Sequence, residues 1–323
     1  MKHIFVLGGT GFVGRHVVQK LVKQGCTVTV ATRRARHARE LQILPGVTVL
    51  EVDVHQQQAL QQALAGHDAV INLVAILHGN EAAFQRTHVD LPATLARAAV
   101  AAGVHRVVHV SALGVNPAQP DAAPSRYLRS KARGELVLRH PELAVAVLRP
   151  SVIFGAEDKF LNLFAALQKV FPFMPLAGAQ ARFQPVWVED VAAAVVQLLH
   201  VRIAAGSTAA WEATGSKVYT LAELVHGAGA WAGVANGRGR PVLPLPDWAG
   251  RLQAALMQLA PGEPMMSADN LDSMKVDNVA SGRFLGLADL GLVPAALEPI
   301  ARDYLQRNQP GYGLLGVRRG SKR

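Results

Sequence analysis

The chain has 323 residues, half of them apolar, and its 33 lysines and arginines against 23 acidic residues give a formal net charge of +10. This length and apolar content are enough for one large domain or two fused domains with a buried core. A single cysteine excludes an internal disulfide framework and fits a reducing compartment, and the absence of an unbroken run of about 18 apolar residues argues against a membrane-spanning helix.

The first 150 residues alternate short apolar runs with helical patterns. Runs rich in β-branched residues predict strands at residues 3–8, 27–32, 47–53, 69–75, 106–112 and 143–149. Amphipathic stretches between them predict helices at Gly11–Gln24, Gln56–Ala65, Ala82–Ala102 and Tyr127–His140. Nearly continuous apolar strands that alternate with helices are typical of a parallel sheet covered on both faces. We therefore predict an α/β fold with a doubly wound, Rossmann-type parallel sheet.

The stretch GGTGFVG follows the first predicted strand and opens the first predicted helix. In the spacing Gly8-x-x-Gly11-x-x-Gly14, the first glycine permits a tight turn, the second lets the backbone approach a pyrophosphate, and the third lets the helix pack on the strand. The helix N-terminus supplies N–H groups and the positive end of a dipole for the phosphates. Because the spacing occurs in the strand–helix context that it requires, it predicts a dinucleotide site.

The end of the second predicted strand indicates which dinucleotide to expect. A binder of NAD typically has Asp or Glu there for the ribose hydroxyls, but this chain reads VATRRAR and has no acid before Glu40. Arg33 and Arg34 can instead form bidentate pairs with a 2′-phosphate. The sequence thus favours NADP(H) over NAD(H), the alternative being that both arginines are ordinary surface residues at a helix start.

Asp53 ends the third predicted strand, and Val54 follows it. The carboxylate can accept a hydrogen bond from the adenine amino group, with Val54 against the ring. It can equally act as the N-cap of the next helix, and the two roles do not exclude each other.

The stretch SRYLRSKARGE holds candidate acid–base residues. Tyr127 and Lys131 are four residues apart, so they share one face of a helix. A lysine charge beside the phenol favours the phenolate and lowers its pKa from about 10, which would make Tyr127 an acid or base near neutral pH. Ser111 ends the fifth predicted strand, where its hydroxyl can orient a substrate carbonyl. The alternative is that Tyr127 and Lys131 lie on a solvated helix face.

Beyond residue 150 the alternation gives way to segments rich in proline and aromatic residues. We expect residues 1–150 to form the nucleotide-binding domain and residues 151–310 a smaller, mostly helical part on the substrate side, interleaved with the sheet edge. Residues 311–323 are expected to form a basic mobile tail. Four phenylalanines, Phe160, Phe164, Phe171 and Phe173, predict core packing of the second part, a pocket for an apolar, quinone or lipid substrate, or a contact with a membrane interface.

The chain resembles an extended or atypical short-chain dehydrogenase/reductase of the NAD(P)-dependent epimerase/dehydratase superfamily. The resemblance rests on GGTGFVG, on Ser111, Tyr127 and Lys131, and on the stretches LRPSVIFG and PVWVEDVA. The resemblance covers most of residues 1–230. It implies that Tyr127 is the acid/base, that Lys131 holds the nicotinamide ribose and lowers the pKa of the phenol, and that Ser111 positions the substrate. It also implies that the backbone near Pro150–Ile153 meets the nicotinamide carboxamide.

A narrower resemblance rests on SALGVNPAQP, FQPVWVEDVA and SADNLDSMKVDNVAS. These stretches are similar to the branch that contains the nucleotide-binding accessory subunit of respiratory complex I and its bacterial relatives. That branch implies a tightly held NADPH with a structural role, so an NADP-dependent reductase and a non-catalytic accessory or assembly protein both stay open. The motifs and the resemblance together predict these nucleotide contacts: Gly8, Thr10, Gly11, Phe12, Val13, Gly14, Arg33, Arg34, Asp53, Val54, Val74, Ala75, Lys131, Pro150 and Ile153.

Positive charge is concentrated in RRARHARE and in the C-terminal VRRGSKR. No interleaved aromatic residues accompany either cluster, so a nucleic-acid partner is not expected, whereas a respiratory membrane complex or an anionic membrane surface fits the charge. Twelve histidines are scattered without the spacing of a metal site, and none is predicted. The N-terminus lacks a signal-peptide pattern. We therefore expect a cytoplasmic protein, with a peripheral location on the inner face of a membrane as the accessory-protein alternative.

Overall fold

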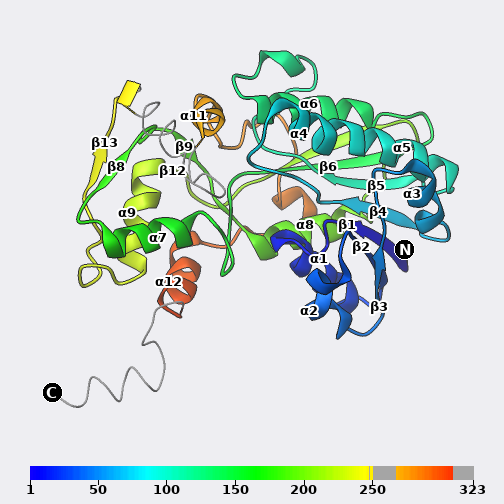
Figure 1. The fold of residues 1–323 in the computed structure, drawn as a ribbon, viewed down its shortest axis with the longest axis horizontal. Coiled ribbons are helices and arrows are strands. Elements are labelled where there is room, and N and C mark those ends of the chain that lie inside the picture. Colours follow the sequence, from blue (N-terminus) through cyan, green and yellow to red (C-terminus); the bar gives the residue numbers. More distant parts are fainter. Residues whose placement is uncertain (247, 250–266, 308–323) are drawn as a thin grey trace. The chain divides into compact units, whose positions relative to one another are not determined.

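A computed structural model describes residues 1–246, 248–249 and 267–307 of the chain (Figure 1). The chain divides into two compact units. The first unit comprises Met1–Ser151, Val188–Thr214 and Ala280–Val293. The second comprises Val152–Trp187 together with the described residues of 215–279 and those from 294 to 307. The predicted tail, residues 311–323, lies outside the described residues.

The first unit is built on one seven-stranded sheet in which every neighbouring pair is parallel. Its strands, in spatial order, are β11 (Thr208–Ala213), β6 (Ala144–Pro150), β5 (Arg106–Val110), β4 (Ala69–Asn72), β1 (His3–Leu7), β2 (Thr27–Thr32) and β3 (Val47–Glu51). The chain runs from β1 out to β3 and then returns to β4 on the other side of β1. Open α/β sheets bind ligands at the carboxyl ends of strands where the order reverses in this way. The predicted Rossmann-type α/β fold is confirmed.

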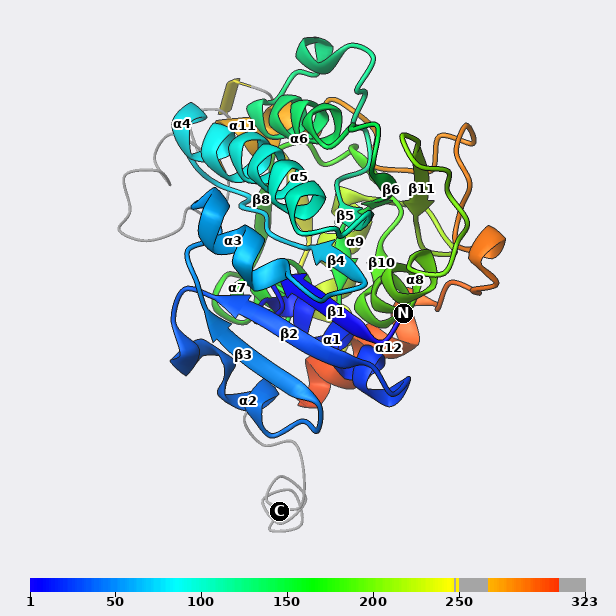
Figure 2. The same ribbon diagram turned by 90° about the vertical axis from the view of Figure 1, so that its right-hand side faces the viewer.

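Helices cover both faces of this sheet, as Figure 1 and Figure 2 show. One face carries α3 (Gln57–Leu64), α5 (Leu91–Ala101) and α6 (Arg126–Val137), and the other carries α1 (Phe12–Lys23) and α8 (Val188–Leu198). The shorter helical segments of the unit are η1 (Ala35–Ala38), α2 (Arg39–Gln42), α4 (Glu81–Phe84), η2 (Gln85–Asp90), η3 (Pro120–Ala122) and η4 (Ala288–Leu290).

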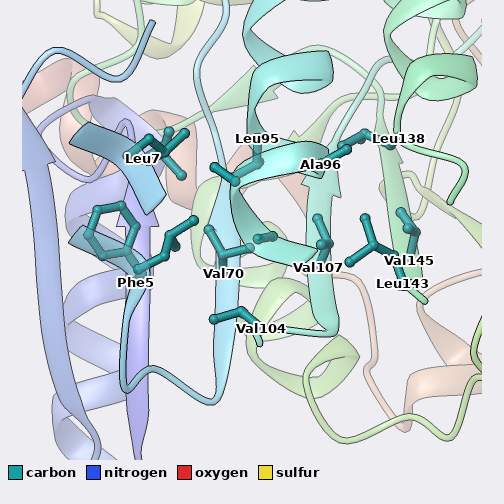
Figure 3. Packing of buried hydrophobic residues seen from close by; sticks show 14 of the residues in the cluster. Phe5, Leu7, Val70, Leu95, Ala96, Val104, Val107, Leu138, Leu143 and Val145 are labelled. Atoms are coloured by element: carbon teal, nitrogen blue, oxygen red, sulfur yellow. The ribbon is translucent and has the colours of Figure 1, made fainter. Parts of the chain in front are cut away.

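Apolar side chains between the sheet and α3, α5 and α6 form the main core of the first unit. Figure 3 shows Phe5 and Val70 from the strands packed in the same layer as Leu95 from α5. The opposite face is apolar too, since Ile4 and Val6 of β1 are fully buried. Each such side chain contributes about 1.5–3 kcal/mol when fully buried. Burial on both faces explains why these strands read as continuous apolar runs.

The predicted strands and helices of the first 150 residues are present; four strands end one to three residues earlier than expected, β2 ends as expected and β6 ends one residue later. One helix differs from the prediction. Residues 82–102 were expected to form a single helix, but they contain the end of α4, the π-helical segment η2 and then α5. A π-helical turn accommodates an extra residue inside a helix, and the apolar periodicity of the sequence does not reveal it.

The second unit combines helices with short two-stranded sheets. Its described helices include α7 (Leu161–Val170), α9 (Leu221–Trp231), α11 (Ala268–Ser273) and α12 (Leu297–Arg307). Its strand pairs are β7 (Ile153–Phe154) with β10 (Val186–Trp187), β8 (Met174–Leu176) with β13 (Val242–Pro244), and β9 (Arg182–Phe183) with β12 (Tyr219–Thr220). Phe160 and Phe164 pack edge to face, with ring centroids 5.3 Å apart, whereas Phe171 and Phe173 remain 50% and 47% exposed.

Segments that follow residue 150 contribute to the sheet unit. β11 pairs in parallel with β6 along its whole length, and α8 packs against α1. Residues 151–310 were expected to be interleaved with the sheet edge, but which of their segments would join it was not predicted. The local sequence of a strand or helix does not show which sheet it joins. No helix among the described residues is long and apolar enough to cross a membrane.

Candidate functional site

The glycine turn after β1 packs closely on the start of α1. Gly8 has a φ of +78°, in the region that favours glycine, and its carbonyl accepts the N–H of Gly11 at 3.0 Å. A side chain at Gly14 would overlap the backbone of Gly8 and Gly9. Within the described residues no side chain caps α1, and its first turn contains no acid. Its first N–H groups and the positive end of its dipole can therefore serve a phosphate.

A cavity of about 550 Å³ opens at the carboxyl ends of β1, β2, β3 and β4. This volume is typical of sites for cofactors and other small molecules. The lining residues are Leu7, Gly8, Thr10, Ala31, Thr32, Arg33, Arg34, His37, Val52, Val54, His55, Val74, Ala75, Ile76, Thr87 and Leu91. Two arginines are among these described residues and no carboxylate is, so the charge of the cavity complements an anion.

The arginine turn after β2 is shaped by two residues that sequence reasoning missed. Thr32 Oγ1 donates to the carbonyl of Arg34 at 3.1 Å and accepts the N–H of Arg34 at 3.3 Å. Glu51 lies opposite Thr32 in β3, and its carboxylate accepts the N–H of Ala35 at 3.0 Å. That carboxylate is thus engaged by the turn, while Arg33 and Arg34 are exposed and line the cavity.

Seven of the predicted nucleotide contacts line this cavity: Gly8, Thr10, Arg33, Arg34, Val54, Val74 and Ala75. Gly11, Phe12, Val13 and Gly14 form the end of the turn and the start of α1. Pro150 ends β6, and Ile153 belongs to the second unit.

Asp53 does not line the cavity. Its Oδ1 accepts the N–H of His55 at 3.0 Å, and its carbonyl accepts the N–H of Gln56 at 3.1 Å. The alternative role of Asp53 as an N-cap is wrong, because α3 begins after Gln56 and Asp53 lies three residues too early. Asp53 stabilises the turn before the helix instead.

The structure brings Lys131 to the end of β5, next to Ser111. Lys131 is 1% exposed, and its Nζ donates a hydrogen bond to the carbonyl of Val110 at 2.7 Å. The N–H of Ser111 donates to the carbonyl of Leu148 at 2.7 Å. Its Oγ, by contrast, is buried and has no hydrogen-bond partner in the described part of the chain. Because a buried hydroxyl without a partner costs free energy, this oxygen fits a polar group supplied by a ligand.

Tyr127 lies in the first turn of α6, whose N-terminus is capped by the side chain of Ser125. Its ring packs edge to face against the rings of Phe84 and His88, at centroid distances of 6.2 and 5.6 Å. Burial raises the pKa of Tyr127 to about 12. Burial also lowers the pKa of Lys131 to about 8, against the opposing effect of the Glu135 carboxylate. The predicted lowering of the Tyr127 pKa by Lys131 is therefore not found, because burial dominates here.

Four buried polar residues, Asn72, His88, His109 and Ser130, adjoin this set, and sequence reasoning missed them all. Asn72 Nδ2 donates to His109 Nδ1 at 3.2 Å, and His88 Nδ1 lies 2.8 Å from Ser130 Oγ. Burial, with the Lys131 charge acting in the same direction, lowers the pKa of His88 to about 3 and holds that of His109 well below its usual range. No motif marks these positions. The only signal in the sequence is that a polar residue stands at a position that the apolar periodicity predicts to be buried in the core.

The family model described as NAD(P)H-binding matches residues 8–201, which include the glycine turn, the cavity walls and the start of α6. The chain belongs to this NAD(P)H-binding family. The family membership fits three features of the described residues: none of their side chains caps α1, none that lines the cavity has a carboxylate, and none gives Ser111 Oγ a hydrogen bond.

Two curated relatives bear on the branch of the family. NADH dehydrogenase (ubiquinone) 1 alpha subcomplex subunit 9, mitochondrial, of Mus musculus is 33% identical over 317 residues, which cover 94% of this chain and 80% of that protein. The ceramide reductase of Caulobacter vibrioides is 30% identical over 198 residues, 60% of this chain and 59% of that protein. The predicted resemblance to this branch of short-chain dehydrogenase/reductase-like proteins is confirmed.

A solved structure shows the same fold. The NADPH-dependent quinone oxidoreductase of Escherichia coli, complexed with NADPH, superposes with a TM-score of 0.72 at 18% identity, over 94% of this chain and 99% of that chain. At this identity the likeness concerns the fold alone.

Proposed function

We propose that this family member binds NADPH in preference to NADH. The supporting observation is the end of the cavity at β2, where Arg33 and Arg34 line the wall and none of the described lining residues carries a carboxylate. The carboxylate of the adjacent Glu51 is occupied by the N–H of Ala35. Guanidinium groups suit a 2′-phosphate, whereas the ribose hydroxyls of NADH find no carboxylate acceptor on this wall.

We further propose that the site reduces an apolar carbonyl substrate. The bound nucleotide would supply a hydride to the carbonyl carbon. Tyr127 would give its phenolic proton to the carbonyl oxygen, which completes the alcohol, and Ser111 Oγ would hold that oxygen in place. A phenol with a pKa of about 12 keeps its proton at neutral pH, as a proton donor must. The positioning role is supported by the buried Ser111 Oγ, which has no hydrogen-bond partner among the residues that the structure describes.

Substitution of Arg33 tests the nucleotide assignment. Arg33→Ala should weaken NADPH binding about tenfold or more, since a hydrogen bond to a charged group contributes about 1.5–3 kcal/mol. NADH binding should change by less than about twofold. Arg36→Ala is the matched control, because Arg36 is exposed on the same segment but does not line the cavity. Equal losses of NADPH and NADH affinity in Arg33→Ala would contradict the assignment of the 2′-phosphate.

A second candidate function is that of a non-catalytic accessory or assembly protein that holds NADPH at the inner face of a respiratory membrane. The subunit-9 relative supports it, because it matches nearly the whole chain whereas the reductase matches little more than half. Val170, Phe171 and Phe173 also expose apolar surface at the end of α7. Purification from native membranes and cytosol separates the two functions: respiratory-complex subunits that co-purify would favour the accessory role, and a chain found alone in the cytosol would favour the enzyme.

A further inference from the structure

The loop that follows β4 forms one wall of the nucleotide cavity. Val74, Ala75 and Ile76 of this loop line the cavity. Two side chains hold its backbone: Asn72 Oδ1 accepts the N–H of Val74 at 3.1 Å, and His88 Nε2 accepts the N–H of Ile76 at 3.1 Å. The position of this wall therefore depends on two buried polar residues that themselves do not line the cavity.

The contact with Ile76 fixes the protonation of the His88 ring. A backbone N–H can only donate, so Nε2 must be the unprotonated nitrogen, and Nδ1 carries the hydrogen of the neutral ring. Nδ1 then donates to Ser130 Oγ at 2.8 Å, and the Ser130 hydroxyl donates to the carbonyl of Tyr127 at 2.8 Å. Each hydrogen bond has one possible direction. The chain of contacts runs from the cavity wall, through one imidazole, to the first turn of α6.

The surroundings of His88 keep the ring neutral and close to α6. The residue is 2% exposed, and burial together with the Lys131 charge lowers its pKa to about 3. It lies in the π-helical segment η2. Its carbonyl approaches Gly134 of α6 so closely that a side chain at Gly134 would overlap it. Glycine at position 134 thus allows η2 and α6 to approach closely at the level of the His88 contacts.

We propose that His88 is a positioning residue of the nucleotide site. It holds the β4 loop through Ile76 and the Tyr127 turn through Ser130, so that the cavity wall and the acid–base helix keep one fixed spacing. This inference rests on the proposed function only in that the cavity binds a nucleotide. It does not depend on the choice between NADPH and NADH, because the wall formed by Val74–Ile76 is separate from the arginine turn.

Two substitutions by amide side chains separate the hydrogen bond of His88 with Ile76 from its hydrogen bond with Ser130. In His88→Asn the side-chain amide nitrogen can take the place of Nδ1 and still donate to Ser130, but no acceptor reaches Ile76. In His88→Gln the longer side chain can bring its amide oxygen to the place of Nε2. Both replacements are neutral. His200→Asn is the control, since His200 is exposed and lies outside the cavity lining.

The first measurement is nucleotide affinity, read from the change in NADPH and NADH fluorescence on binding. His88→Asn should weaken the binding of both nucleotides by about tenfold, because the unpaired N–H of Ile76 destabilises the bound position of the wall. His88→Gln should bind within about threefold of the parent, and His200→Asn should match it. Failure of glutamine to restore affinity in a folded variant would overturn the proposal. A merely structural role would lower the melting temperature of both variants equally and leave the affinity of the folded molecules unchanged.

Amide hydrogen exchange in the nucleotide-free protein gives a second readout. The N–H of Ile76 should exchange faster in His88→Asn and remain protected in His88→Gln. Equal exchange in the two variants would overturn the proposal even if nucleotide binding could not be measured. If the parent protein binds neither nucleotide, the proposed function fails, and the exchange data then decide only whether His88 holds the β4 loop. A loss of preference for NADPH over NADH in Arg33→Ala tests the 2′-phosphate assignment and does not bear on the role of His88.

Discussion

Two glycines of the same turn should respond to alanine in opposite ways. Gly14 packs on the turn, and a Cβ there would overlap the Gly8 carbonyl and lie 2.6 Å from Gly9 Cα and 2.7 Å from Gly9 C. These are backbone atoms that cannot swing aside as a side chain can. Gly11 has an ordinary extended conformation, φ −78° and ψ 176°, and a Cβ there would meet only the Gly8 carbonyl, at 3.3 Å.

These distances set the expected magnitudes. Gly14→Ala forces α1 away from β1 and should lower the free energy of unfolding by about 3 kcal/mol, the upper end of the usual cost of overpacking. At roughly 2–4 °C per kcal/mol, the melting temperature should fall by about 6 °C or more. Gly11→Ala should keep its stability within about 1 kcal/mol, because the small strain is offset by the reduced freedom of the unfolded chain.

Nucleotide affinity should be lowered in Gly11→Ala, the variant whose stability is nearly normal. In Gly11→Ala the methyl group occupies the N-cap of α1, where a phosphate must approach the first N–H groups of the helix, so NADPH affinity should fall about tenfold or more in a protein of nearly normal stability. Thermal melting and NADPH fluorescence titration measure both quantities on the same samples. Unchanged affinity in Gly11→Ala would refute the phosphate-binding role of the turn. Unchanged stability in Gly14→Ala would refute the close packing of α1 on β1.

Three further outcomes are expected. Tyr127→Phe should abolish any carbonyl reduction while NADPH stays bound within about threefold, and continued turnover would remove Tyr127 from the mechanism. Glu135→Gln should destabilise the protein by about 3–5 kcal/mol in denaturant unfolding, because it breaks a buried pair in which Arg149 donates to both carboxylate oxygens at 2.9 and 2.6 Å. The control Asp121→Asn removes an exposed carboxylate and should cost less than about 1 kcal/mol in the same measurement. The stability that neutral His88 provides is complete above pH 6.5 and is lost as the pH falls toward its folded pKa of about 3. The unfolding free energy should therefore drop by about 2 kcal/mol between pH 6.5 and 5 because of this residue, at about 1.4 kcal/mol per pH unit. In His88→Gln the unfolding free energy should depend less on pH. The same pH dependence in the parent and in His88→Gln would contradict the burial of a neutral ring.

The sheet could be predicted because its central strands, β1, β4, β5 and β6, are buried on both faces. Burial of this kind requires unbroken apolar runs such as residues 4–7 and 69–71, and the helices between them follow from their periodicity. The glycine turn could also be predicted from the sequence, because close packing leaves no room for a side chain at Gly14 and so requires glycine there. These features depend on residues near one another in the sequence.

The site was only partly predictable because its contacts connect distant segments. His88 and Ser130 are 42 residues apart, and Asn72 and His109 are 37 apart, so no spacing rule links them. The pKa of Tyr127 was expected to be low from the neighbouring Lys131, but burial, which local sequence does not report, raises it. The role of Asp53 depended on where α3 begins, a boundary that propensity places only within a few residues.

Identification of the bound nucleotide tests the central claim most directly. The protein is purified gently at low salt, and the nucleotide released on denaturation is identified by mass spectrometry, with Arg33→Ala and Arg36→Ala treated in parallel. The account predicts NADP⁺ or NADPH from the parent and from Arg36→Ala, and a clear loss of both from Arg33→Ala. NAD(H) as the main nucleotide of the parent, or equal retention of NADP(H) by Arg33→Ala, would contradict it.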